Sequence, residues 1–207
     1  MRDCGGMVDP SVLNGLGWPL PGHELLAFDL VALWSEPHRR YHDVRHLAEC
    51  LAASALLGGG TDEALALWFH DAVHTGTPGR DEAASAALAH ERLAPLLSAD
   101  RVAEVVRLVL VTERHVVAPY DDAGAVVSDA DLWVLGADPA RYAESVADLR
   151  EETGLADRAW TAVRRAQLER RLARPIYATA AGREREPSAR RNLSAELAVL
   201  CSPRDFT

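Results

Sequence analysis

Apolar residues recur at intervals of three and four along most of this chain, which is the spacing of an amphipathic helix. The alternation of polar and apolar positions that marks a strand occurs nowhere convincingly. The pattern therefore predicts an all-α protein, with helix ends placed by glycine, proline and capping residues. The expected helices cover residues 23–35, 43–58, 61–73, 81–93, 98–117, 126–135, 139–153, 157–173 and 188–200.

Composition at the two ends divides the chain into three parts. Residues 1–22 hold several glycines and prolines and are expected to form an irregular lead-in. Residues 23–174 are expected to form one helical bundle. Residues 175–207 are expected to form a C-terminal loop and helix docked on that bundle, with the polar residues 179–187 as the loop. A chain of 207 residues can bury enough surface to fold without disulfides or other cross-links.

Composition and charge exclude several classes of protein. Apolar residues make up 48% of the chain and charged residues 26%, as in an ordinary soluble globular protein. The net charge of -9 argues against binding to a nucleic-acid polymer or an anionic membrane. Cys4, Cys50 and Cys201 lie far apart and form no CxxC pair, so we expect no thiolate zinc site and a reducing, cytoplasmic compartment. We find neither a secretory signal nor an uninterrupted apolar span.

The histidines carry the strongest chemical signal. All 8 lie within the first 115 residues. His42 and His46 are four residues apart at the start of an expected helix, so their rings share one face. His70 and His74 have the same spacing, and Asp71 follows His70 at the end of an apolar helix. Burying an imidazole beside a carboxylate costs several kcal/mol unless both are hydrogen-bonded or bind a metal, so these residues are candidate ligands.

Two further carboxylates, Asp129 and Asp131, lie in an apolar segment. Residues two apart on a helix point about 200° away from each other, so one should face a site while the other caps, pairs or contacts solvent. A set of imidazoles and carboxylates suits Mn, Fe, Zn, Ni or Co, whereas an all-oxygen set suits Mg or Ca. The chain can thus supply four ligands to one ion, from His46, His70, Asp71 and Asp131.

The order of these residues resembles that of the HD superfamily of metal-dependent phosphohydrolases. The local sequences are similar to one bacterial branch of that superfamily, described as predicted metal-dependent phosphohydrolases. The matching segments are RYHDVRHL at 40–47, LALWFHDAV at 65–73, DADL at 129–132, LG at 135–136, RPIY at 174–177 and ARRNL at 189–193. The resemblance covers roughly residues 34–198 and implies an HD-domain helical bundle with a C-terminal helical extension.

The resemblance implies a ligand set as well. His70 and Asp71 match the HD pair, and Asp131 matches the final aspartate, with Asp129 as the fallback. His46 is the preferred first histidine. His42 is the alternative ligand, or a contact to the substrate phosphate.

Other roles follow less directly from the resemblance. Glu82, after the HD helix, is a candidate general base or a partner that holds a ligand histidine. His115 is a candidate ligand of a second ion or a phosphate contact. His74 stands where the branch usually has tyrosine, so ligand, phosphate contact and simple replacement all stay open. Arg45, with its neighbours Arg39 and Arg40, can attract a phosphate.

These expectations favour an enzyme that hydrolyses a small phosphate ester or anhydride, such as a nucleotide, with water activated by a divalent transition metal. Magnesium is also compatible, and Asp71 is the ligand with the most direct catalytic role. One alternative is a di-iron oxygenase with extra ligands from His42, His74 and His115. Another is a non-catalytic nucleotide-binding or structural helical domain. A homo-oligomer is compatible with each, because HD proteins often self-associate.

Overall fold

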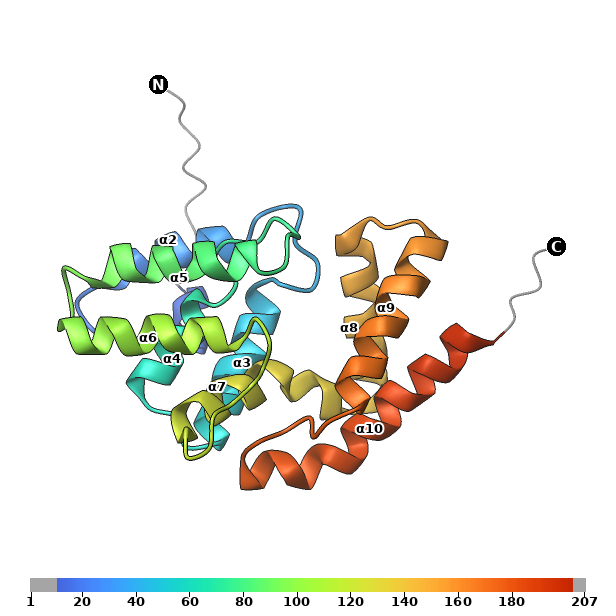
Figure 1. The fold of residues 1–207 in the computed structure, drawn as a ribbon. Coiled ribbons are helices and arrows are strands. Elements are labelled where there is room, and N and C mark those ends of the chain that lie inside the picture. The colour runs from blue at the N-terminus through green and yellow to red at the C-terminus, as the bar shows by residue number, and fades with distance from the viewer. Residues whose placement is uncertain (1–10, 203–207) are drawn as a thin grey trace.

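The computed structural model describes residues 11–202, and this part of the chain is helical throughout, with no strand (Figure 1). The all-α prediction is therefore confirmed. The helices are α1 (Ser11–Leu16), α2 (Glu24–Trp34), α3 (Val44–Leu56), α4 (Thr61–Phe69), α5 (Arg80–Leu93), α6 (Ala99–Val111), α7 (Asp122–Asp131), the 3-10 turn η1 (Leu132–Gly136), α8 (Pro139–Thr153), α9 (Asp157–Leu172) and α10 (Ala180–Cys201).

Two segments expected to be irregular contain helix. The short α1 lies within residues 1–22, of which residues 1–10, with Cys4, lie outside the described part. The polar residues 179–187 were predicted as a loop, and that prediction is wrong, because α10 begins at Ala180 and continues through Pro187. The Thr179 side chain accepts a hydrogen bond from the Gly182 N–H and caps the helix. The cap helps α10 to begin at Ala180. The helix then continues through Pro187, although proline has no N–H to donate to the preceding turn.

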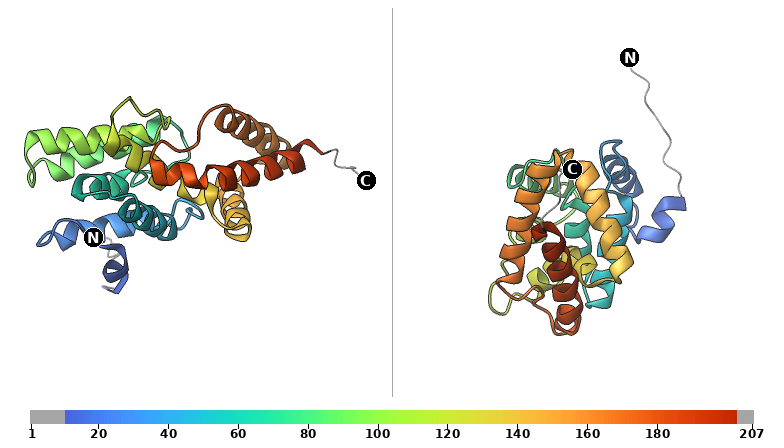
Figure 2. Two further views of the ribbon diagram at one scale, coloured as in Figure 1. Left: turned by 90° about the horizontal axis from the view of Figure 1, so that it is seen from below. Right: turned by 90° about the vertical axis from the view of Figure 1, so that its right-hand side faces the viewer.

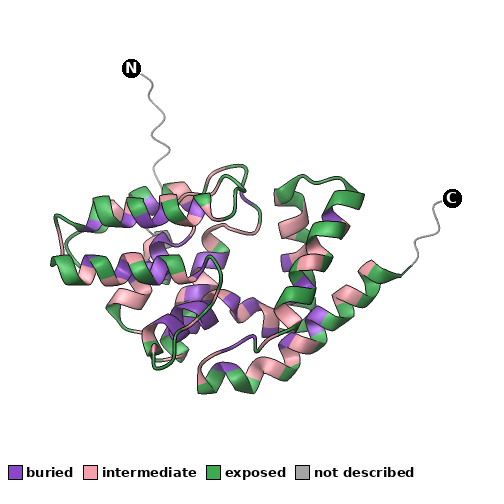
Figure 3. Cartoon of the chain, in the orientation of Figure 1, coloured by how far each residue is buried: buried purple, intermediate pink, exposed green. Residues whose placement is uncertain are grey.

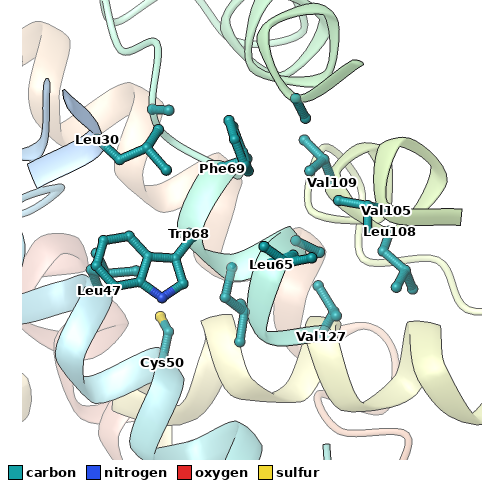
Figure 4. Close-up of a cluster of buried hydrophobic side chains, with 14 of the residues drawn as sticks. Leu30, Leu47, Cys50, Leu65, Trp68, Phe69, Val105, Leu108, Val109 and Val127 are labelled. Carbon is teal, nitrogen blue, oxygen red and sulfur yellow. The ribbon is translucent and has the colours of Figure 1, made fainter. Parts of the chain in front are cut away.

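The buried side chains form two hydrophobic clusters. The first cluster draws on the helices from α2 through α7 and surrounds α4, in which residues 65–69 are all fully buried (Figure 4). Buried and exposed positions alternate along α5 and α6, as expected for helices with one face on this core (Figure 3). The second cluster joins η1, α8, α9 and α10 through Leu132, Tyr142, Leu168, Tyr177 and Leu193.

Along the chain, the buried residues of the first cluster end at Ala130 and those of the second begin at Leu132. In Figures 1 and 2, α8 and α9 form a hairpin beside the first group of helices, and α10 packs on η1 and α9. Among residues 11–202, no helix combines the length and the apolar character needed to cross a bilayer.

Candidate metal centre

Three helix ends bring His46, His70, Asp71 and Asp131 together. The Asp43 side chain accepts hydrogen bonds from the N–H groups of Arg45 and His46, which starts α3 and places His46 in its first turn. His70 and Asp71 directly follow the last residue of α4. Asp131 is the last residue of α7. The site is therefore held by helices whose other residues fill the first core.

Each of the two histidine Nε2 atoms lies within 4 Å of a carboxylate oxygen of Asp71 and of one of Asp131. His70 Nε2 is 3.1 Å from Asp71 Oδ2, and His46 Nε2 is 3.1 Å from Asp131 Oδ1. The two Nε2 atoms are 3.3 Å apart. His70 Nε2 is 3.6 Å from Asp131 Oδ1, and His46 Nε2 is 3.9 Å from Asp71 Oδ2. Bond lengths of about 2.0–2.2 Å give ligand–ligand distances of this size, so the four side chains can hold one ion.

Hydrogen bonding prepares His70 for this role. Its Nδ1 lies 2.8 Å from the Leu67 carbonyl oxygen, which can only accept, so Nδ1 carries a hydrogen and Nε2 faces the cluster. Burial opposes charge on His70, but Asp71 and Asp131 outweigh it and raise its pKa well above the ordinary value. His70 in turn holds the pKa of both carboxyl groups well below the usual range, against the effect of burial. Both carboxylates are thus ionised at neutral pH, as ligands must be.

Asp129 points away from this cluster. Its oxygens accept hydrogen bonds from the N–H groups of Ala178 and Thr179, both at 2.8 Å, and from the Thr179 hydroxyl at 2.7 Å. It is fully buried, and burial raises the pKa of its carboxyl group. The structure thus places Asp131 with the two histidines, while Asp129 anchors the start of α10.

His115 lies against the far side of Asp131. Its Nε2 is 3.5 Å from Asp131 Oδ2, and its Nδ1 is 3.3 Å from the Ser128 hydroxyl. The backbone of His115 is left-handed (φ 51°), which a histidine adopts only at some cost. Burial, with the charges of Arg171 and Arg174, lowers its pKa to about 4, so the ring is neutral at pH 7. A neutral ring can donate from Nε2 to Asp131.

Of the other residues predicted from the sequence, some lie at the site and others do not. His42 and His74 lie next to Asp71, with His42 Nε2 3.9 Å from Asp71 Oδ2 and the two rings 4.3 Å apart. Glu82 borders the cavity described below, but its carboxylate accepts the Gly79 N–H and so caps α5. Arg45 is half-exposed and pairs with Glu144 and Glu49 instead.

Arg39 supports the backbone of the site rather than a phosphate. Its buried guanidinium donates to the carbonyl oxygens of His42, Asp71 and Ala72. Arg40 also lies elsewhere, paired with Glu151.

Cys50 and Glu152 are near the site and were not predicted from the sequence. Cys50 is one turn after His46, a spacing that was visible, and its Sγ lies 3.6 Å from both ring nitrogens of His46. A sulfur equidistant from both nitrogens cannot also be about 2.3 Å from an ion on the Nε2 lone pair, so Cys50 packs on the ring and is not a ligand. Glu152 gave no local signal, because it reaches the site from the end of α8.

A cavity of about 630 Å³ borders the site and lies between the helices of the two hydrophobic clusters, called the first and second core below. The first core contributes Tyr41, Asp71 and Asp131, and the second contributes residues of α8 and α9 such as Glu152 and Arg164. This volume is within the range of small-molecule sites.

No family model matches this chain, and the searches of curated proteins and of solved structures likewise gave no match.

Proposed function

We propose that this protein is a metal-dependent phosphohydrolase of the HD type. The observation that carries the proposal is the convergence of two imidazoles and two carboxylates from three helix ends at the wall of a cavity. The proposed ligands are His46, His70, Asp71 and Asp131. Their order along the chain, and the sequence around them, support the same assignment.

These four residues would hold a divalent ion, which would lower the pKa of a bound water toward ~7 and polarise a phosphoryl oxygen. The protein supplies the rest. The Leu67 carbonyl fixes the orientation of His70, and His115, whose Nδ1 contacts the Ser128 hydroxyl, packs against Asp131. Arg39 holds the backbone at Asp71 and Ala72 by donating to both of their carbonyl oxygens. The ligands are thus positioned before a substrate binds, which reduces the reorganisation needed during the reaction.

Two arginines favour an anionic substrate. Among residues 11–202, the Arg171 guanidinium has no hydrogen-bond or ion-pair partner, and the Arg174 guanidinium donates to the Arg114 carbonyl oxygen alone. Burial, followed by the charge of Arg174, lowers the pKa of Arg171 to about 10, so the group remains cationic at neutral pH. Both charges act on His115, beside Asp131. We infer that they attract the phosphate of a small soluble ester or anhydride, such as a nucleotide.

The proposal is tested by phosphate release. Metal-stripped protein is loaded in turn with Mn, Fe, Zn, Ni, Co or Mg and assayed against phosphate esters and nucleotides, with Asp131→Asn in parallel. We expect release that depends on the ion and falls at least about 100-fold in the variant. Nucleotide binding without release would contradict the proposal and favour a non-catalytic domain. Oxygen consumption by the iron-loaded protein without phosphate release would contradict it in favour of the oxygenase.

A further inference from the structure

A second group of potential ligands lies beside Asp71. It consists of His42, just before α3, His74, in the loop after α4, and Glu152, near the end of α8. Glu152 Oε1 is 2.5 Å from His42 Nδ1 and 3.1 Å from His74 Nε2. All three residues line the cavity that also borders Asp71 and Asp131.

The two oxygens of Glu152 have different partners. Oε2 accepts the backbone N–H groups of Arg40, Tyr41 and His42 at 2.8–3.0 Å, which fixes the carboxylate to the segment before α3. Oε1 faces only the two imidazoles. The side chain is 5% exposed, and no arginine pairs with it among the described residues. Three N–H groups thus stabilise one oxygen of this buried carboxylate, whereas the other oxygen has only the two imidazoles as partners.

We propose that His42, His74 and Glu152 bind a second divalent cation beside the first. Two nitrogens and one carboxylate oxygen suit Mn, Fe, Co, Ni or Zn better than Mg or Ca. The remaining coordination positions face the cavity, where water or substrate can occupy them.

Small movements of the side chains make room for the ion. Ligand atoms of one tetrahedral ion lie about 3.3 Å apart, as follows from bonds of about 2.0–2.1 Å. His74 Nε2 is already 3.1 Å from Glu152 Oε1. The 2.5 Å contact between Oε1 and His42 Nδ1 must open by less than about 1 Å.

The role of this site in catalysis rests on the proposed function, because two neighbouring ions can stabilise both the attacking and the leaving oxygen of one phosphoryl group. The existence of the second metal site does not depend on the proposed function, so metal binding is measured separately from phosphate release. The full-length protein is stripped of metal and titrated with Mn²⁺ at pH 7.5, and bound equivalents are measured by equilibrium dialysis. Helix content is checked for every variant by circular dichroism.

We expect two equivalents in the wild type and one in Glu152→Gln. Glutamine keeps a carbonyl oxygen for the backbone N–H groups of residues 40–42, so the segment stays in place. His74→Phe, which leaves those contacts untouched, should also bind one equivalent. Asp131→Asn should lose the first ion and keep the second. Glu151→Gln is the matched control and should bind two, because Glu151 is exposed and pairs with Arg40.

One equivalent in the wild type, unchanged in Glu152→Gln, would overturn the second site and leave Glu152 as a residue that positions His42. Two equivalents in Glu152→Gln would overturn it equally. No binding in the wild type would refute both sites. Two equivalents that fall to one in Glu152→Gln, without phosphate release on any substrate, would support the second site while the proposed function fails.

Discussion

Asp129 and Asp131 are two residues apart in α7, and we expect their isosteric amide variants to behave oppositely. Asp129 is fully buried, and both of its oxygens accept backbone N–H groups. In Asp129→Asn, one acceptor becomes an NH₂ donor that faces another donor. Losing a hydrogen bond to a charged acceptor and leaving a buried donor unpaired costs about 3 kcal/mol. Removing a buried charge returns part of this cost, so we expect a net loss of about 2 kcal/mol.

For a chain of this length, that loss lowers Tm by roughly 4–8 °C, both with chelator and with added metal. The rise in Tm on adding the ion should be the same in Asp129→Asn as in the wild type. Asp131→Asn should instead lose the contribution of its site to that rise, about 2.7 kcal/mol when the ion is at 100 times its dissociation constant. Thermal unfolding with and without metal, followed by circular dichroism, measures both effects.

Two results would refute the assignment of these carboxylates. One is an Asp129→Asn protein that keeps its chelated Tm and loses the response to metal. The other is an Asp131→Asn protein with the wild-type response to metal. Either would mean that the orientation of α7 around the site is wrong by about half a turn.

Three further predictions concern the surroundings of the site. Because burial lowers the pKa of His115 to about 4, the unfolded chain binds this proton from about pH 6.5 while the folded protein does not. In the metal-free protein, the contribution of His115 to the free energy of unfolding should therefore be complete above pH 6.5 and fall by up to about 3 kcal/mol toward pH 4. His115→Asn, in which asparagine tolerates the left-handed backbone, should show a weaker dependence of stability on pH. The same pH dependence in the variant and the wild type would contradict the reasoning. Arg171→Gln should raise KM for the phosphate substrate about 10-fold at unchanged metal content, as expected for loss of a contact worth ~1.4 kcal/mol, and an unaltered KM would remove Arg171 from the binding site. Gly182→Ala places a Cβ 2.4 Å from Asp129 Oδ2 and should lower the free energy of unfolding by about 2 kcal/mol, whereas Gly15→Ala, with nothing within 4 Å, should not; equal denaturation midpoints for both would count against the packing described around Asp129.

Helices with local start and stop signals could be predicted closely from the sequence. Asp138 and Pro139 at one end and Gly154 at the other define α8, and its predicted range of 139–153 agrees with the structure. The extent of α10 could not be predicted in this way. Its first turns are polar and contain Pro187, and they are held by contacts with residues distant in sequence, including Asp129.

The same distinction applies to the candidate site. His46, His70 and Asp71 were found because helical spacing and an apolar context give them a local signal, and the structure brings them together with Asp131. Arg45 was chosen for its position beside two histidines, but on a helix the neighbouring residue points about 100° away, and here it pairs with Glu144. The apolar context of His70 and Asp71 therefore indicated the cluster, whereas a position beside two histidines was not enough to place the Arg45 side chain at the site.

Glu152 and Arg171 lie on α8 and α9, the hairpin that contributes to the second hydrophobic cluster. Their distance along the chain from the first group of helices explains why the sequence analysis did not find them. The first core supplies His46, His70, Asp71 and Asp131 without help from α8 or α9. The hairpin of α8 and α9 adds the carboxylate that meets His42 and His74, and a cationic side chain without an acidic partner. Because the cavity lies between the two cores, a change in how they pack alters the second ligand set and the charge facing the substrate, while the first four ligands keep their geometry. Affinity for the first ion and selectivity among phosphate substrates are thus expected to depend on different helices.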